Sequence, residues 1–399
     1  RPERLVQTLT DSHNFWPFKT STDTTVALAR QLIACRSVTP ADDGCLDLIA
    51  ATLTASGFEC ERIDRGEVRN LWARRGQASP LVCLAGHVDV VPPGPLDLWT
   101  TDPFVATERH GYLYGRGASD MKSSVAAMVT ALERLVASQP RHSGSIALLL
   151  TSDEGGDAVD GTVAVVEALQ RRADTIDTCI VSEPTSSARL GDTVKNGRRG
   201  SLNGTLTVKG ISCHIAYPER GRNPIHAALP ALAELLSVEW DRGHEHFPPT
   251  SLQISNVHAG AGTVNVIPDA LDVRFNVRFS PASTAEEIKA RIRAVLDRHR
   301  MEYDLVWHPA AEPFITAPGR LAQTLVRTIA EVTGLTPELS TGGGTSDGRF
   351  LARVAREVVE FGPVAVSMHG ADERVRIDDL GPLSVIYERT VAALPNSVS

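Results

Sequence analysis

Short apolar runs alternate with helical segments through the first half of the chain, and this alternation limits the fold more than any other feature. Three apolar runs have the length of buried strands: 81–84, 146–150 and 178–181. Three segments have the apolar spacing of helices: 24–33, 44–56 and 123–136. Strands that alternate with helices predict an α/β domain with a mostly parallel sheet and helices on both of its faces.

The pattern changes near Gly200 and returns near Pro313. Three segments between these points alternate apolar and polar residues, as strands with one solvated face do: 201–208, 252–257 and 270–279. Two helices accompany these strands, at 223–236 and 283–298. We expect Ser283 and Glu286 to form a capping box at the start of the second helix.

This organisation and a length of 399 residues predict two domains. We expect an α/β catalytic domain at 24–199 and 313–399, closed by a strand at 358–361 and a helix at 379–394. An α+β domain at 200–312 is inserted into it. Residues 1–23 are set apart as an N-terminal segment, and they lack the continuous apolar core that a secretory signal needs.

The composition argues against several classes of protein. A formal net charge of -8 argues against binding to nucleic acid, which usually requires a basic patch. No apolar run reaches the roughly 18 residues that a membrane helix needs. The chain has no CxxC pair among its cysteines, which are Cys35, Cys45, Cys60, Cys83, Cys179 and Cys213. This pattern is typical of reduced thiols in a cytoplasmic protein.

Residues suited to metal binding follow several strands and one glycine-rich loop. The set consists of His87, Asp120, Glu154, Glu183 and His369. Because the carboxyl ends of parallel strands meet at one edge of a sheet, we expect these side chains to converge there. Histidines and carboxylates without thiolates suit zinc, cobalt or manganese, and one carboxylate can bridge two ions in a hydrolytic site.

Asp89 lies two residues after His87 in an extended segment, so the two side chains point to the same side. We expect the Asp89 carboxylate to hold the far ring nitrogen of His87, as outer carboxylates do for metal-bound histidines. Alone, a histidine at a strand end or an aspartate in a glycine-rich loop is more often structural. The prediction of a metal site therefore depends on the whole set.

Motifs spread from about Thr24 to Leu394 resemble those of the succinyl-diaminopimelate desuccinylases, within the wider family of zinc aminoacylases and carboxypeptidases. The motifs are GHVDVVPPG, LYGRGASDMK, TSDEGGDAVDGT, SEPT, VKNGRRGS, HIAYP with RNPIH, NVIP and STGGGTSDGRF. The resemblance implies metal-dependent hydrolysis of N-succinyl-LL-2,6-diaminopimelate to succinate and LL-2,6-diaminopimelate, a step toward lysine and the cell wall. It leaves out residues 1–23.

The same resemblance implies roles at the metal centre. His87 and Glu183 match ligands of one metal ion, Asp120 matches a bridging carboxylate, and His369 matches a ligand of a second ion. Glu154 matches the general base, and Asp89 the partner of His87. The implied cofactor is zinc, one or two ions per subunit, with cobalt as another metal that would serve. A cis peptide between Asp120 and Met121 is also implied.

The resemblance further implies that the inserted domain forms a homodimer and acts as a lid. His214 matches a histidine that reaches the partner subunit's active site and helps to stabilise the oxyanion there. The residues that match the substrate pocket, or whose charge suits an N-succinyl amino acid, are Lys195, Arg198, Asn265, Arg278, Gly344, Thr345, Ser346 and Arg349. Arg199 is interpreted as a solvated or salt-bridging surface residue.

Two positions depart from the family pattern. Gly155 stands where the family has a glutamate that binds the second metal, so we expect that site to be weakened, with Asp157 as a nearby acid. Ala365 replaces a pocket asparagine. These departures keep two alternatives open: a related deacylase such as an acetylornithine deacetylase, and a catalytically impaired homologue that acts by binding.

Overall fold

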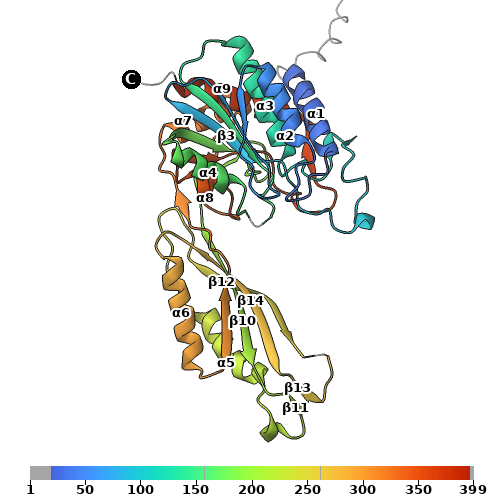
Figure 1. Ribbon diagram of the computed structural model, residues 1–399, viewed down its shortest axis with the longest axis vertical. Helices are drawn as coiled ribbons and strands as arrows, with labels where there is room; N and C mark the ends of the chain where they lie inside the picture. The colour runs from blue at the N-terminus through green and yellow to red at the C-terminus, as the bar shows by residue number, and fades with distance from the viewer. Residues whose placement is uncertain (1–18, 157, 261, 396–399) are drawn as a thin grey trace, which may run out of the picture. The chain divides into compact units, whose positions relative to one another are not determined.

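The computed structural model describes residues 19–156, 158–260 and 262–395, and it divides into two compact units (Figure 1). The first unit takes the chain up to Val194, then Arg320–Glu338, and then the chain from Phe361 onward. The second unit comprises Lys195–Gly319 and Leu339–Glu360. Most of the N-terminal segment 1–23, and Asp157, lie outside the described residues.

The sheet of the first unit is parallel at its centre. Five strands lie in the order β1 (Glu59–Arg62), β2 (Asn70–Arg75), β6 (Ser145–Thr151), β3 (Leu81–His87) and β7 (Ile176–Val181). β3 is parallel to both β6 and β7, whereas β1 and β2 are antiparallel additions. Every residue of β3 and β6 is buried, which explains why these strands are uninterrupted apolar runs.

Helices cover both faces of this sheet, as expected from the alternating pattern. The chain passes from β3 through α3 (Lys122–Ser138) to β6, and then back through α4 (Thr162–Arg171) to β7 on the other side of β3. Since such crossovers are right-handed, the reversal of direction places α3 and α4 on opposite faces. α1 (Lys19–Ala34), α3 and α9 (Ile377–Ala393) pack on one another (Figure 1).

Other elements complete the first unit. α2 (Cys45–Ala55) packs on β1, β2 and α3, and α7 (Arg320–Thr333) packs on α9. A small antiparallel sheet joins β4 (Thr107–Arg109), β5 (Tyr112–Tyr114) and β19 (Arg374–Arg376). This sheet brings the loop that contains Asp120 close to the segment that follows His369.

The second unit is a four-stranded antiparallel sheet covered by two helices. The strand order is β12 (Ser251–Ala259), β14 (Ala270–Phe279), β10 (Gly200–Lys209) and β15 (Tyr303–Trp307). α5 (Pro224–Ser237) and α6 (Ala285–Arg298) bury their apolar faces with the inner faces of β10 and β14. A two-stranded ribbon of β11 (Cys213–His214) and β13 (Val266–Ile267) extends from the end of this sheet (Figure 1).

Short elements connect the larger ones. They are η1 (Leu96–Leu98), β8 (Thr193–Lys195), β9 (Gly197–Arg198), η2 (Pro218–Arg220), β16 (Phe314–Ile315), β17 (Glu338–Ser340), α8 (Gly348–Leu351) and β18 (Ala355–Glu360). None of the helices in the described part of the chain has both the length and the apolar character that crossing a bilayer requires.

The predicted α/β class is confirmed, and the predicted strands and helices of both units are present, with ends that shift by a few residues. The predicted capping box of Ser283 and Glu286 is wrong by one residue. Thr284 is the N-cap: its hydroxyl accepts from the Glu287 N–H at 3.2 Å, and the Glu287 carboxylate accepts from the Thr284 N–H at 2.8 Å. Both pairs have the required spacing, so the spacing alone did not decide between them.

Candidate active site

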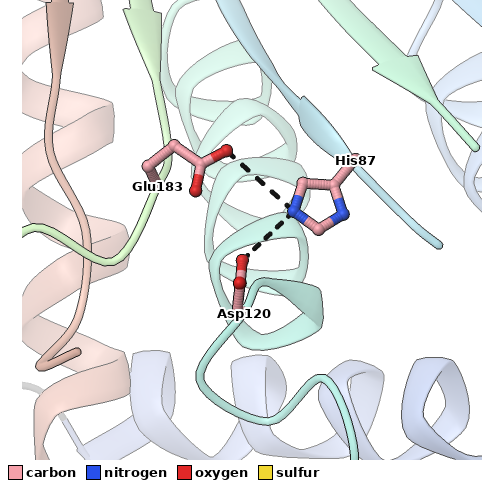
Figure 2. Close-up of side chains that lie close together, drawn as sticks. All are labelled: His87, Asp120 and Glu183. Carbon is pink, nitrogen blue, oxygen red and sulfur yellow. Dashed lines mark hydrogen bonds and ion pairs between the residues drawn. The ribbon is translucent and has the colours of Figure 1, made fainter. Parts of the chain in front are cut away.

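His87, Asp120 and Glu183 converge at the carboxyl edge of the parallel strands (Figure 2). His87 is the last residue of β3, Glu183 lies two residues after β7, and Asp120 lies two residues before α3. The register aligns His87 with Thr151 of β6 and Ala85 with Val181 of β7, so the three strands end within two residues of one another. One ligand atom from each of the three side chains lies within 4.8 Å of the others, and all three residues are buried.

The Asp120 carboxylate lies between two imidazoles. His87 Nε2 lies 3.1 Å from Asp120 Oδ1, and His369 Nε2 lies 3.0 Å from Asp120 Oδ2. Glu154 Oε2 and Glu183 Oε1 lie 3.8 and 3.9 Å from the same His87 nitrogen. The structure therefore brings together the five residues that the sequence proposed for this site. The peptide bond between Asp120 and Met121 is cis, as the resemblance implied.

The charges of this cluster fit a divalent cation. Four carboxylates, those of Asp89, Asp120, Glu154 and Glu183, gather around at most two positive imidazoles. Burial alone would lower the pKa of His87, but the hydrogen bond with Asp120 and the nearby Asp89 carboxylate raise that pKa well above its ordinary value. Burial acts to raise the pKa of Asp120, and the hydrogen bonds of His369 and His87 lower it overall. Buried carboxylates in excess of this kind need a compensating cation. The donor set of His87, Asp120 and Glu183 suits zinc.

Asp89 aligns both the histidine and the predicted base. The His87 Nδ1 hydrogen bond goes to the main-chain oxygen of Asp89, at 2.8 Å, and the Asp89 carboxylate oxygen is farther away at 3.5 Å. The carboxylate instead accepts the main-chain N–H groups of Glu154, at 3.3 Å, and Gly155, at 3.0 Å. One fully buried residue thus orients the ligand His87 and the segment that carries Glu154.

Glu373 is a positioning residue that the sequence analysis did not single out. Its carboxylate accepts the main-chain N–H groups of Gly117, Ser119 and Asp120, at 3.0, 2.9 and 2.9 Å. It also accepts a 2.6 Å hydrogen bond from the Arg116 guanidinium. Both charged side chains are 1% exposed. These contacts, which we call the Glu373 clamp, fix the loop that presents Asp120. The only indication of them in the sequence is Arg116, which lies between two glycines in the motif GRG.

Replacing Glu373 by glutamine should lower the free energy of unfolding by about 3–5 kcal/mol, because it leaves a buried arginine without its charge partner. Metal affinity should fall by about 10-fold or more, since the loop that holds Asp120 loses its anchor. Denaturant unfolding and calorimetric metal titration measure the two effects. Glu388→Gln is the control, because its pair with Arg134 is partly exposed and contributes at most about 1 kcal/mol. Equal effects of the two variants would contradict this role.

Most of the residues proposed for substrate binding lie in the second unit, near the start of β10. Arg198 is 8% exposed and pairs with Glu360, which is fully buried. Ser346 donates its hydroxyl hydrogen to the same Glu360 carboxylate, so Glu360 joins VKNGRRGS to the glycine-rich loop that contains Gly344 and Thr345. Lys195 Nζ donates to Ser340 Oγ at 3.1 Å. The Arg349 guanidinium stacks over the Phe350 ring, 4.3 Å from its centroid.

Arg278 and Arg199 have unsatisfied donors in this region. Arg278 Nη1 and Arg199 Nε are buried and have no hydrogen-bond partner within the described chain. Burial lowers the pKa of both side chains, and the charges of Arg199 and Arg198 lower that of Arg278 further. The interpretation of Arg199 as a solvated or salt-bridging surface residue fails for its Nε, which is neither solvated nor paired, although the side chain as a whole is half-buried, beside Arg278. Guanidinium groups with buried, unsatisfied donors of this kind are suited to a carboxylate ligand.

His214 and Asn265 lie at the opposite end of β10, on the β11–β13 ribbon. His214 pairs with Val266, and the Ile215 N–H donates to the Asn265 carbonyl at 3.0 Å. The Ala216 N–H donates to His214 Nδ1 at 3.1 Å, which leaves the ring proton on Nε2, in an exposed side chain. The ten residues of β10 separate this histidine from the arginine cluster by about 30 Å within one copy of the second unit.

The chain is similar to known proteins over nearly its whole length. The family model described as "Peptidase family M20/M25/M40" matches residues 83–393. A protein of Bordetella avium (strain 197N) named "Succinyl-diaminopimelate desuccinylase" is 60% identical over 367 residues, which cover 92% of this chain and 97% of that protein. A protein of the same name from Dechloromonas aromatica (strain RCB) is 57% identical over 372 residues, covering 93% and 99%.

Solved structures share the fold at much lower identity. An M20 family metallo-carboxypeptidase from Sulfolobus solfataricus superposes with a TM-score of 0.77 and 16% identity, covering 93% of this chain and 99% of that one. Human carnosine dipeptidase 1 superposes with a TM-score of 0.73 and 19% identity, covering 94% and 97%. At these identities the likeness concerns the fold alone.

Proposed function

Because the chain belongs to peptidase family M20/M25/M40, and within it to the succinyl-diaminopimelate desuccinylases, we propose that it hydrolyses the amide of N-succinyl-LL-2,6-diaminopimelate. The products are succinate and LL-2,6-diaminopimelate, a precursor of lysine and of the cell wall. One observation carries the proposal: a chain 60% identical to a desuccinylase over nearly its whole length has His87, Asp120 and Glu183 converging in one buried cluster, with Glu154 beside it.

The residues of the first unit divide the chemistry between them. His87, Asp120 and Glu183 would hold a zinc ion, or cobalt, which when bound acts as a Lewis acid on the amide carbonyl and on water. Glu154 accepts a proton from the attacking water and passes it to the leaving amine nitrogen. Its main-chain N–H is held by Asp89, and its side chain is 19% exposed, so the carboxylate is both oriented and open to water.

Recognition of the substrate is assigned to the arginine cluster of the second unit. The proposed substrate carries three carboxylates and one free amine, so its site needs fixed cations. Arg278 and Arg199 supply enclosed donors without partners, whereas Arg198 is already paired with Glu360 and holds the loop at Ser346 in place. This division supports Arg278 as the direct contact to a substrate carboxylate and Arg198 as the residue that shapes the pocket.

We also propose a homodimer in which His214 serves the partner subunit. About 30 Å along β10 separates this side chain from the arginine cluster, farther than a small N-acyl amino acid extends. Both can therefore act on one substrate only when they come from different copies of the second unit. β12 is an edge strand, and Leu229, Leu236 and Val257 are 57%, 59% and 60% exposed on α5 and β12. An open edge beside exposed apolar residues supports association between copies.

The second metal position is proposed to be weak. Of the residues that the structure describes, His369 and the shared Asp120 remain there, and Gly155 contributes no side chain. The Gly155 N–H is used by Asp89. A single ion with one general base suffices for hydrolysis, so this change does not exclude activity. The reaction is placed in the cytoplasm, which is consistent with the absence of disulfides among the six cysteines, all within the described residues.

Gly155→Glu should create a second strong metal position. The backbone tolerates the change, because a Cβ on Gly155 would meet Asp89 Oδ2 at 3.3 Å and Val91 Cγ1 at 3.5 Å, and small shifts relieve both contacts. The new carboxylate should raise affinity for the second ion by at least about 10–100-fold. Zinc titration followed by metal counting measures this gain, and Gly155→Gln is the uncharged control. If the two variants bind the second ion equally, Gly155 does not occupy a ligand position.

A substrate panel tests the proposed reaction. We expect turnover of N-succinyl-LL-2,6-diaminopimelate at saturating zinc or cobalt and much weaker turnover of N-acetylornithine, because the acetyl compound lacks the succinyl carboxylate. Release of the free amine measures both rates. Preference for N-acetylornithine would indicate that the chain is a related deacylase. Ala365 favours this alternative, because it replaces an asparagine of the family's substrate pocket. Metal binding without turnover of either compound would overturn the enzymatic proposal.

A further inference from the structure

Two cysteines lie together where α1 is followed by the loop into α2. Cys35 comes directly after α1, and Cys45 is the first residue of α2. The Leu32 carbonyl accepts the Cys35 N–H at 3.2 Å and the Cys45 thiol at 3.8 Å, so the two residues meet at one acceptor. The Cys35 thiol donates to the Gln31 carbonyl at 3.5 Å, so the two thiols bind neighbouring carbonyls at the end of α1. No other role in the fold or in the proposed reaction uses this pair.

The two thiols differ in accessibility. Cys35 is partly exposed, whereas Cys45 is fully buried. The loop between them is held firmly: Ser37 Oγ donates to the Val88 carbonyl at 2.8 Å, and the Val90 N–H donates to the Ser37 carbonyl at 2.9 Å. A reagent can therefore reach Cys35 first, and the second sulfur is already in place behind it.

The surroundings favour ionisation of the accessible thiol. The hydrogen bond from Cys45 lowers the pKa of Cys35 to about 6, and the charge of Lys122 also lowers it, against burial and the charges of Asp43 and Asp42. The hydrogen bond with Cys35, together with burial, raises the pKa of the Cys45 thiol. An accessible thiolate with a neighbouring thiol is the arrangement of a redox-sensitive pair.

We propose that Cys35 and Cys45 form an oxidation site at which hydrogen peroxide converts the two thiols to a disulfide. The Cys35 thiolate attacks one peroxide oxygen, the O–O bond breaks, and the second oxygen leaves as water once protonated, which gives a sulfenic acid at Cys35. The Cys45 sulfur then attacks the Cys35 sulfur, the S–O bond breaks, and a second water leaves with the Cys45 proton. In total, two thiols and one hydrogen peroxide give one disulfide and two waters.

The remaining cysteines provide internal references. Cys60 and Cys213 are also partly exposed, and their thiols, like that of Cys35, donate to carbonyl oxygens, those of Ala50 at 3.7 Å and Tyr217 at 3.4 Å. Cys83 and Cys179 face each other across β3 and β7, yet both are 0% exposed and out of reach of a reagent. Exposure together with a neighbouring thiol distinguishes Cys35 within the described chain.

Peptide mapping after treatment with hydrogen peroxide tests the proposal. Trypsin releases Cys35 in the peptide 31–36 and Cys45, with Cys60, in the peptide 37–62. The Cys60→Ser variant therefore makes the assignment unambiguous, because a cross-link between these two peptides can then involve only Cys45. We expect this cross-link to be the main product at low peroxide. At pH 6, thiolate content and nucleophilicity together predict that Cys35 reacts about 10-fold faster than an ordinary thiol.

Two variants separate the steps. Cys45→Ser should leave a sulfenic acid at Cys35 that dimedone traps, and Cys35→Ser should abolish the cross-link and the fast reaction. Prior unfolding in urea should remove the selectivity of the wild-type chain for Cys35. Equal oxidation of Cys35, Cys60 and Cys213 in the folded protein, or oxidation of Cys35 without a bond to Cys45, would overturn the proposal. These readouts do not depend on amide hydrolysis, so they stand apart from the proposed function.

Discussion

Replacement of Glu154 by glutamine should lower kcat by about 10²–10⁴-fold, the range expected when a general base is removed. Glutamine keeps the size of the side chain but cannot accept a proton from water or return one to the amine. Metal content should stay unchanged, because His87, Asp120 and Glu183 form the metal cluster without it. Steady-state kinetics at saturating zinc, with metal counting on the same samples, measure both quantities.

Asp160→Asn is the matched control for this variant. Asp160 belongs to the same acidic stretch, TSDEGGDAVDGT, but its carboxylate faces Arg65 at 4.0 Å, and its main-chain N–H is bound by Asp153. Its loss should change kcat by less than about 2-fold, as expected for a surface ion pair. If Glu154→Gln retained wild-type kcat with its metal bound, another residue would have to act as the base.

Replacement of His214 by alanine should lower kcat by about 10²–10³-fold, the usual effect of removing one donor to an oxyanion. The hydrogen bond from Ala216 to Nδ1 leaves the Nε2 proton free to be donated to the tetrahedral oxyanion. His214 makes no contribution to the buried core, so unfolding free energy and metal content should remain close to those of the wild type. Loss of stability instead of kcat would contradict the catalytic role.

Mixed dimers of Glu154→Gln and His214→Ala chains test whether His214 acts across the subunit boundary. If it does, each mixed dimer has one site with both substitutions and one site with neither. Co-expression in equal amounts makes half of the dimers mixed, so about a quarter of the wild-type activity should return. If His214 acted within its own subunit, every site would carry one substitution and no activity would return.

The sequence alone was sufficient to predict the site residues that lie at the ends of apolar strands. His87, Glu154 and Glu183 follow three apolar runs, and the register of β3 with β6 and β7 makes those runs end at the same edge. The central strands were also predicted because they are buried on both sides and therefore lack polar interruptions. β1 was not predicted, since three of its four residues, Glu59, Glu61 and Arg62, are charged, and the strand lies at the edge of the sheet.

The residues that orient the site were harder to predict because they act through contacts between distant segments. Glu360 was assigned to a strand, but its pairing with Arg198 and Ser346 depends on the arrangement of three segments. Glu373 accepts main-chain N–H groups, and a main-chain donor has no signature in the sequence. Arg199 was interpreted as a surface residue because an arginine is usually solvated, and its burial depends on neighbours that the sequence does not reveal.

The Glu373 clamp has a consequence for the biosynthesis of the protein. The hydrogen bond between the Asp120 N–H and Glu373 joins positions separated by 253 residues, and α9, the last helix, packs on both α1 and α3. A nascent chain that has emerged only as far as α7 already contains His87, Asp120 and Glu183, but it lacks the residue that shapes the Asp120 loop. The Asp120 loop can therefore take its final geometry only after Glu373 has been synthesised, and products of nonsense mutations between α7 and Glu373 lack this clamp.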